Sequence, residues 1–181
     1  MSTPKISKIK MALLKMKGRN FKNNNPEQLN FNQVKHVTLF YDVRQMQKNQ
    51  RQIFEFIETL SNQGKTVTSI VLYPTNDPKT IGKTHQTDLI SLCLKDFTRY
   101  GLPKSEIALK AISASSDLYI DLNSHFDYTS IGLAMMCKSV YKVSPYYPEY
   151  KPYFNILLKH EEDADLNEYL CSITDFFKHL K

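Results

Sequence analysis

The chain has 181 residues and a formal net charge of +6, with 41% hydrophobic and 23% charged residues and only five glycines and eight prolines. This composition excludes wholesale disorder, and the length suits one well-buried core better than two independent domains. No apolar stretch approaches the roughly 20 residues that a bilayer-spanning helix needs, and the apolar part of the N-terminus is too short for a signal peptide. We therefore expect a cytoplasmic protein without a transmembrane segment.

The positive charge is concentrated at the N-terminus. Residues 1–26 contain seven cations and no acidic residue, whereas residues 27–181 carry 17 cations against 18 acidic residues. We therefore divide the chain into a basic amphipathic arm, residues 1–26, and a single α/β domain, residues 27–181. The cations of the arm, which are candidates for contact with an anionic surface, are Lys5, Lys8, Lys10, Lys15, Lys17, Arg19 and Lys22.

Four apolar residues of the arm recur at spacings of three and four, which predicts a short helix with lysines on its other sides. They are Ile6, Ile9, Leu13 and Met16. Gly18 and the asparagine-rich run before Pro26 predict the end of this helix and a flexible tether to the body.

Three interpretations of the arm stay open. Its apolar stripe packs on the body and its lysines are solvated, as charge runs usually are. Alternatively the lysines contact RNA phosphates, in which case binding weakens steeply with salt. As a third possibility, the helix attaches to an anionic membrane surface by apolar insertion and charge attraction. Phe21 is the single aromatic residue of the arm, which gives little support to base stacking.

The body begins with a β-α-β pattern. The run "HVTLFY" at residues 36–41 is rich in strand-forming residues and ends at Asp42, which predicts a buried strand. A helix with Ile53 on its apolar side follows and stops at Gly64, and "VTSIVLY" at 67–73 predicts the next strand. Such a unit has a right-handed crossover and parallel strands.

Strands and helices continue to alternate. Residues 103–112 have helix-like spacing, although the alternation of Ile107 with Leu109 is also compatible with a short strand. Asp165 and Glu168 resemble a capping box at the start of the last helix. The alternation predicts a three-layer, Rossmann-like α/β domain with a mostly parallel sheet, preceded by a basic N-terminal helix. The remaining strands are expected at 88–94, 117–122, 140–143 and 154–158, with helices at 127–138 and 166–180.

Polar residues follow the expected strands where they end. In open α/β sheets, ligands bind outside the carboxyl ends of the strands, so Asp42, Asn123, Ser124 and His125 are candidates for ligand contacts along this rim. Within "DLNSH" two interpretations stay open. The segment is a turn in which Asn123 or Ser124 caps the next helix, or it is a rim that contacts a ligand. We assign no catalytic residue.

The sequence lacks the motifs of common cofactor sites. Neither G-x-G-x-x-G nor a P-loop occurs, and the five histidines have no H-x-x-x-H or C-x-x-C partner that would indicate zinc. No G-x-S-x-G elbow is present, and Gly132 is expected to permit close packing within a helix. We expect no metal and no cofactor. The cysteines are interpreted as reduced core thiols; they are Cys93, Cys137 and Cys171.

The segments "SSDLYIDLN", "CKSVYKVSPYYPEYKPYFNILL" and "LNEYLCSITDFFKHL" resemble a small family of uncharacterised proteins from Bacteroidota, known as a domain of unknown function. The resemblance covers most of the chain and implies no activity. More distantly, the core is similar to the acceptor-side half of heptosyltransferase-like glycosyltransferases. That likeness implies the fold and not the reaction, because the nucleotide-sugar domain has no counterpart here and Val143-Ser144 stands where those enzymes tend to have glycine.

We therefore expect a non-catalytic cytoplasmic binding or adaptor module rather than an enzyme. Its arm would contact RNA or the ribosome. The alternatives are a small-ligand-binding protein or enzyme that uses the rim, and peripheral attachment to an anionic membrane surface. A protein partner is also conceivable, because aromatic residues are enriched in interfaces. The tyrosines Tyr141, Tyr146, Tyr147, Tyr150 and Tyr153 form either such a patch or a loop over the sheet edge.

Overall fold

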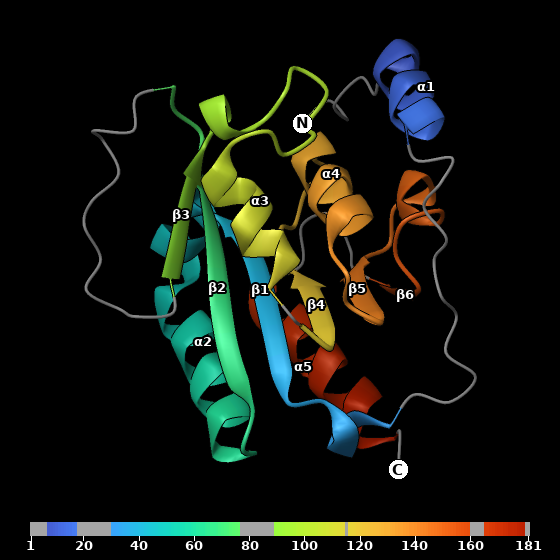
Figure 1. Ribbon diagram of the computed structural model, residues 1–181. Coiled ribbons are helices and arrows are strands. Elements are labelled where there is room, and N and C mark those ends of the chain that lie inside the picture. The colour runs from blue at the N-terminus through green and yellow to red at the C-terminus, as the bar shows by residue number, and fades with distance from the viewer. Residues whose placement is uncertain (1–6, 18–29, 77–88, 115, 160–164, 180–181) are drawn as a thin grey trace.

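Six parallel strands form one sheet in the order β3-β2-β1-β4-β5-β6, as the computed structural model in Figure 1 shows. The structure describes residues 7–17, 30–76, 89–114, 116–159 and 165–179. The expected Rossmann-like α/β domain is confirmed, and each strand of the described residues is parallel to its neighbours in the sheet. The strands are β1 (His36–Asp42), β2 (Thr66–Tyr73), β3 (Leu89–Cys93), β4 (Leu118–Asp121), β5 (Tyr141–Pro145) and β6 (Ile156–Leu158).

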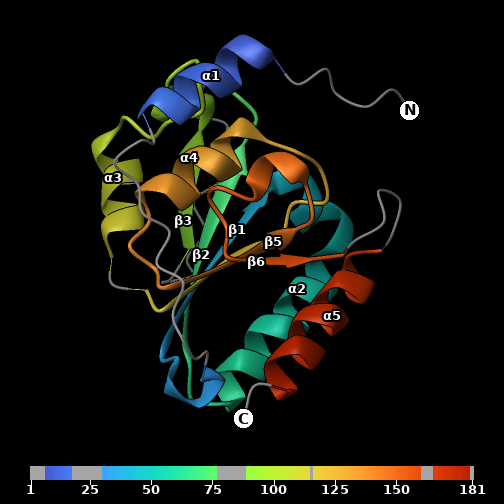
Figure 2. The same ribbon diagram turned by 90° about the vertical axis from the view of Figure 1, so that its right-hand side faces the viewer.

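Helices cover both faces of the sheet (Figure 1, Figure 2). α2 (Val43–Asn62) and α5 (Leu166–Lys178) pack on one face, and α3 (Glu106–Ser113) and α4 (Tyr128–Met136) pack on the other. Right-handed crossovers explain this division. The chain moves from β1 to β2 in one direction and from β3 to β4 and on to β5 in the other, so the connecting helices fall on opposite faces.

The central strands are apolar on both sides because both of their faces are covered. In β1, Val37, Leu39 and Tyr41 belong to the core beneath α2 and α5, whereas Phe40 belongs to the core beneath α3 and α4. All four side chains are at most 1% exposed. The continuous apolar run that predicted this strand therefore reflects burial on two sides.

The ends of the helices agree with the sequence in most places. α2 stops at Asn62, and Gly64 follows with a positive φ of 75°, a conformation that favours glycine. Residues 106–113 are helical, which excludes a strand there, and the Ser105 side chain accepts a hydrogen bond from the Ala108 N–H. The predicted capping box of α5 is wrong, because Asp165 occupies the N-cap position but its side chain makes no capping hydrogen bond.

Two glycines bring α4 against the segment that precedes α3. A Cβ on Gly132 would lie 2.0 Å from the carbonyl oxygen of Gly101, and a Cβ on Gly101 would lie 2.5 Å from the carbonyl oxygen of Tyr128. Gly101 also has a positive φ of 85°. The expectation that Gly132 permits close packing is confirmed.

Most of the tyrosines that follow β5 belong to the core. Tyr150 and Tyr153 are 0% and 3% exposed, and the Tyr150 ring stacks on Phe154 with a centroid distance of 4.9 Å. Tyr147 packs edge-on against Tyr150, and Tyr146 is exposed. The tyrosine-rich segment is therefore packed into the protein, and only Tyr146 among these four is available to a partner.

The cysteines differ from one another in exposure. Cys93 and Cys137 are buried free thiols, as expected, but Cys171 is exposed on α5. The expectation of three core thiols is wrong for Cys171, because it lies on the outward side of an amphipathic helix whose other side, with Leu170 and Ile173, is buried.

Candidate functional site

The predicted rim residues meet where β1 and β4 end side by side. These strands are neighbours, and the connections that leave them run in opposite directions along the sheet. This is the switch point at which open α/β sheets form a crevice. The Asn123 Oδ1 accepts a 2.8 Å hydrogen bond from the Asp42 N–H, so the two strand ends are tied directly.

Asp42 links three parts of the rim. Its Oδ1 accepts a hydrogen bond from the Gln45 N–H and thus caps α2. Its Oδ2 accepts two hydrogen bonds from Arg44, at 2.6 and 3.1 Å, and lies 3.5 Å from His125 Nε2. Arg44 Nη2 and His125 Nε2 are 3.4 Å apart. Asp42 is 2% exposed and both its oxygens have partners, so it orients Arg44 and caps α2.

Hydrogen bonds between polar groups connect α2 with the loop after β4. The Gln45 side-chain amide donates to Ser124 Oγ, and Asn49 Nδ2 donates to Gln45 Oε1. Asn49 is buried and has non-helical φ and ψ angles of −128° and 32°, which kink α2. The Tyr147 hydroxyl donates to the Ser124 carbonyl. The rim residues therefore form a connected polar network, while ligand contact by them stays a prediction.

The cap of α4 is not the one expected. Asp127 is the N-cap, and its Oδ1 accepts a hydrogen bond from the Thr129 N–H. Asn123 and Ser124 lie outside the helix, so the prediction that one of them caps it is wrong. Asn123 instead donates its side-chain N–H to Asp121 Oδ1 while its backbone N–H donates to the same oxygen. α4 begins at Tyr128, close to the expected start at residue 127.

Replacing Asn123 by alanine should lower the free energy of unfolding by about 2–3 kcal/mol. The substitution leaves the buried Asp42 N–H without its acceptor and removes one of the two hydrogen bonds that Asp121 Oδ1 accepts from Asn123, and buried unpaired groups cost about that much. Ser124→Ala is the matched control, with an expected loss of about 1 kcal/mol or less, because Ser124 is only half-buried. Urea denaturation followed by circular dichroism measures both values, and equal losses would contradict the assigned network.

Asp121 is a fully buried carboxyl group at the end of β4. Its Oδ2 has no partner of normal hydrogen-bond geometry, and neither has the nearby Ser130 hydroxyl. Burial raises the pKa of Asp121 to about 7, while the hydrogen bonds from Asn123 and the proximity of Ser130 lower it in part. The carboxyl group therefore titrates near neutral pH.

The basic arm contains the helix α1 (Lys8–Lys17), which packs on the body beside α4 (Figure 2). Met11 and Leu14 are 7% and 0% exposed and join the core beneath α3 and α4. In contrast, Ile9 is 73% exposed and Met16 is 61% exposed. Of the three interpretations of the arm, the one in which the apolar stripe packs on the body is therefore wrong for Ile9 and Met16. The helix buries Met11 and Leu14, leaves Ile9 and Met16 in solvent, and holds Leu13 half-buried.

Tyr128 fixes the start of α1. Its hydroxyl oxygen accepts a 2.6 Å hydrogen bond from the Ser7 N–H, and Lys10 Nζ lies 5.0 Å from the centre of its ring. The Ser7 hydroxyl accepts from the Lys10 N–H, as an N-cap side chain does. Lys8 is exposed and Lys10 is half-exposed. Of the other predicted cations, Lys15 and Lys17 belong to α1, whereas Lys5, Arg19 and Lys22, together with Ile6, lie outside the described residues.

Three further exposed cations lie in the segment that follows β3. The segment after β3 contacts Tyr128 through Gly101, and Tyr128 also holds the start of α1. This segment carries Lys95, Arg99 and Lys104, all exposed, and its one acidic residue, Asp96, accepts from the Cys93 N–H. Sequence analysis missed this group because its cations are spread over ten residues.

One family model matches residues 8–180, nearly the whole chain. The chain belongs to DUF6913, a family of unknown function. The match starts with the first residue of α1, so the family unit contains this helix together with the α/β body of the DUF6913 protein. No curated protein and no solved structure matches the chain.

The DUF6913 protein shows no metal-ligand group in the part of the chain that is described: no three His, Cys, Asp or Glu side chains gather there as ion ligands would. Within the same residues, no helix is long and apolar enough to span a bilayer. Arg44 and Gln45 were missed as rim residues although they lie two and three residues after Asp42. An Asp at the start of a helix is a signal for capping, and it could have indicated the Gln45 contact.

Proposed function

We propose that this protein is a non-catalytic binding module that attaches to an anionic lipid surface through the outward side of α1. The observation that carries the proposal is the exposure of Ile9 and Met16 on a helix whose other apolar side is already buried in the core. Two large apolar residues held in water seven positions apart favour a partner that can bury them.

The charge around this apolar stripe supports an anionic partner. Residues 1–26 contain seven cations and no acidic residue. The segment after β3, whose Gly101 approaches the Tyr128 that holds the start of α1, adds the exposed Lys95, Arg99 and Lys104. A lysine or arginine near an anionic lipid surface contributes about 1 kcal/mol, and burying an Ile or Met side chain contributes about 1.5–3 kcal/mol. Both contributions are needed, because neither alone attaches a protein stably.

Ribosomal RNA, the partner expected from charge alone, would use the same cations. RNA contact would leave Ile9 and Met16 in water, because phosphates and riboses bury little aliphatic surface. Exposed aliphatic residues beside lysines are instead typical of helices that lie in the membrane interface. The predicted cytoplasmic location suits this proposal, because the cytoplasmic leaflet carries the anionic lipids. The resemblance of the core to heptosyltransferase-like enzymes stays a prediction, and we propose no reaction from it.

Flotation of the full-length protein with lipid vesicles tests the proposal. We expect binding to vesicles with about one third phosphatidylserine, no binding to pure phosphatidylcholine, and partial release by salt. The double variant Ile9→Ser and Met16→Ser should bind at least tenfold more weakly, because about 1.4 kcal/mol already gives that factor. Val140→Ser is the matched control and should bind normally, because Val140 is exposed just before β5, at the amino end of the sheet.

Sedimentation of the same proteins with ribosomes distinguishes the competing partner. If the protein does not float with vesicles but binds ribosomes in a salt-sensitive way, and the double variant binds them equally well, then RNA and not lipid is the partner. Flotation that is insensitive to the double variant would show that the apolar stripe is not the contact.

A further inference from the structure

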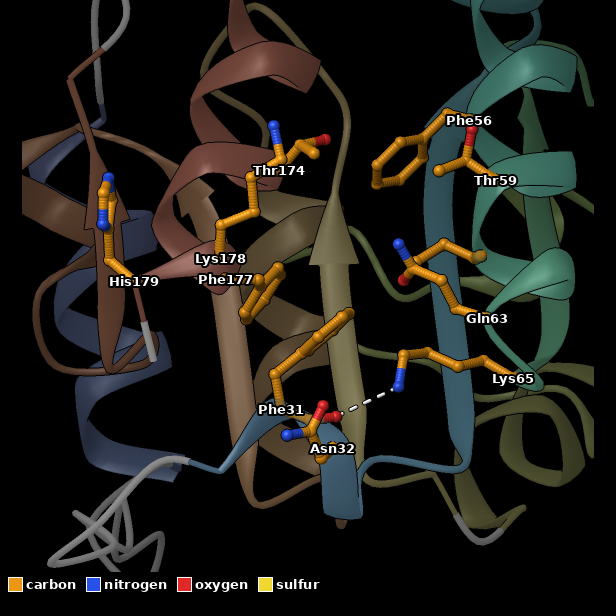
Figure 3. A pocket seen from close by; sticks show the side chains of 11 residues that line it. Phe31, Asn32, Phe56, Thr59, Gln63, Lys65, Thr174, Phe177, Lys178 and His179 are labelled. Carbon is orange, nitrogen blue, oxygen red and sulfur yellow. Dashed lines mark hydrogen bonds between the residues drawn. The ribbon is translucent and has the colours of Figure 1, made fainter. Parts of the chain in front are cut away.

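A hollow of about 960 Å³ lies at the amino end of the sheet (Figure 3). The rim and α1 lie at the opposite end (Figure 2). Its walls come from the C-terminal halves of α2 and α5, and its lower end is formed by η2 (Phe31–Gln33) and the start of β2. The volume falls in the range of sites that hold small organic molecules. No predicted site residue lines it, so it is a separate place on the molecule.

The wall of the hollow combines polar side chains with an apolar part that is made by three phenylalanines and a leucine. The rings of Phe31 and Phe177 stack at a centroid distance of 4.2 Å and an interplanar angle of 15°, and Figure 3 shows them facing the space between the helices. Phe56 and Leu60 of α2 complete the apolar side. A flat or aliphatic group can therefore be buried here.

One buried cation stands at the lower end of the hollow. Lys65 is 8% exposed, and its ammonium group donates to the Phe31 and Val34 carbonyls at 3.0 and 2.9 Å. The same nitrogen lies 4.0 Å from the centre of the Phe31 ring. Desolvation lowers the pKa of Lys65, partly offset by Asp117. Carbonyl oxygens and an aromatic ring do not neutralise an ammonium ion, which has three donors.

The other polar groups at the hollow leave Lys65 as the anchor for an anion. No acidic side chain is among the described residues that line the hollow. Lys178 already pairs with Asp175 at 3.0 Å, and Figure 3 shows His179 on the side of α5 that is remote from α2. A negative group that enters the hollow would therefore gain most at Lys65.

We propose that this hollow binds a small amphipathic carboxylate, with its carboxyl group at Lys65 and its apolar chain or ring against Phe31, Phe56 and Phe177. The apolar wall selects the body of the ligand and the buried ammonium selects its charge. The site is independent of lipid attachment by α1, because it lies at the opposite end of the sheet.

Titration of the full-length, ¹⁵N-labelled protein with decanoate and with decanol tests the site by nuclear magnetic resonance. Decanoate should shift the amide signals of η2 and of the C-terminal halves of α2 and α5. Decanol, which has the same chain without the charge, should bind about tenfold more weakly, because one charge-assisted contact contributes about that factor.

Variants test the site without the need to assign each NMR signal to a residue. Lys65→Met should weaken decanoate binding about tenfold and leave decanol binding unchanged. Thr174→Trp should abolish binding of both, since Thr174 lines the hollow and an indole would fill it. Lys48→Met, an exposed position near the other end of α2, is the charge-matched control and should bind normally. Equal affinities for decanoate and decanol, or unchanged binding to Thr174→Trp, would overturn the proposal.

Discussion

Gly132→Ala should lower the free energy of unfolding by about 3 kcal/mol, at the upper end of the usual cost of overpacking. The added methyl group would lie 2.0 Å from the Gly101 carbonyl oxygen and 2.8 Å from its carbonyl carbon. Both are backbone atoms, so relief requires α4 or the segment around Gly101 to move. An alanine in a helix is normally about 1 kcal/mol more stabilising than a glycine. A loss of stability in Gly132→Ala would therefore itself indicate the close contact with Gly101.

Gly64→Ala is the matched control for this substitution. Nothing lies within 4 Å of a Cβ at Gly64, but the residue has a φ of 75°, which costs about 1 kcal/mol for a side chain that is not glycine. Urea denaturation followed by circular dichroism compares the two variants. If Gly132→Ala were as stable as the native protein, the close approach of α4 to Gly101 would be incorrect.

Asp121→Asn should make the protein more stable than the native chain at pH 8, by about 2 kcal/mol. Burial raises the pKa of the native Asp121 to about 7, so at pH 8 the folded protein holds a buried carboxylate whose Oδ2 has no partner. An amide has the same shape and cannot ionise. The gain is smaller than the full ionisation cost of about 4 kcal/mol, because a neutral amide accepts weaker hydrogen bonds from Asn123.

The pH dependence of this effect has a definite sign. Between the unfolded pKa of 3.8 and the folded pKa of about 7, the folded state binds more protons than the unfolded state, so native stability falls as pH rises through this window. The difference between the native protein and Asp121→Asn should therefore be small near pH 4 and largest above pH 7. Burial lowers the pKa of Lys142 to about 8, so the scan is best ended at pH 8. A difference that is independent of pH would contradict the assignment.

Asp117→Asn provides a control of opposite sign. Burial raises the pKa of Asp117, but the N–H groups of His36 and Lys35, which both donate to its Oδ2, lower it below the usual value overall. Asp117 therefore stabilises the folded state above its unfolded pKa, and that stability is lost as pH falls. The variant should be less stable than the native protein at pH 7, with a difference that shrinks in acid.

The order and type of the elements could be read from the sequence because the signals are local. The run of apolar residues in β1, the glycine after α2 and the 3.6-residue spacing of α5 each depend on a few neighbours. The meeting of Asp42 with Asn123 could also be predicted, because both follow the ends of parallel strands. Their roles could not be predicted. The Asn123 side chain is hydrogen-bonded at the strand ends, and Asp127 caps α4 instead.

The sequence by itself determined the strands, the helices, their parallel arrangement and the separation of positive charge into residues 1–26. Only the tertiary structure decided which side of α1 is buried, because both Met11 with Leu14 and Ile9 with Met16 are apolar at helical spacing, and contact with Tyr128 and the core chooses between them. Only it could bring Phe31, Lys65 and Phe177 around one hollow. These residues are far apart in the chain, and their contact depends on how α2, α5 and the sheet pack together.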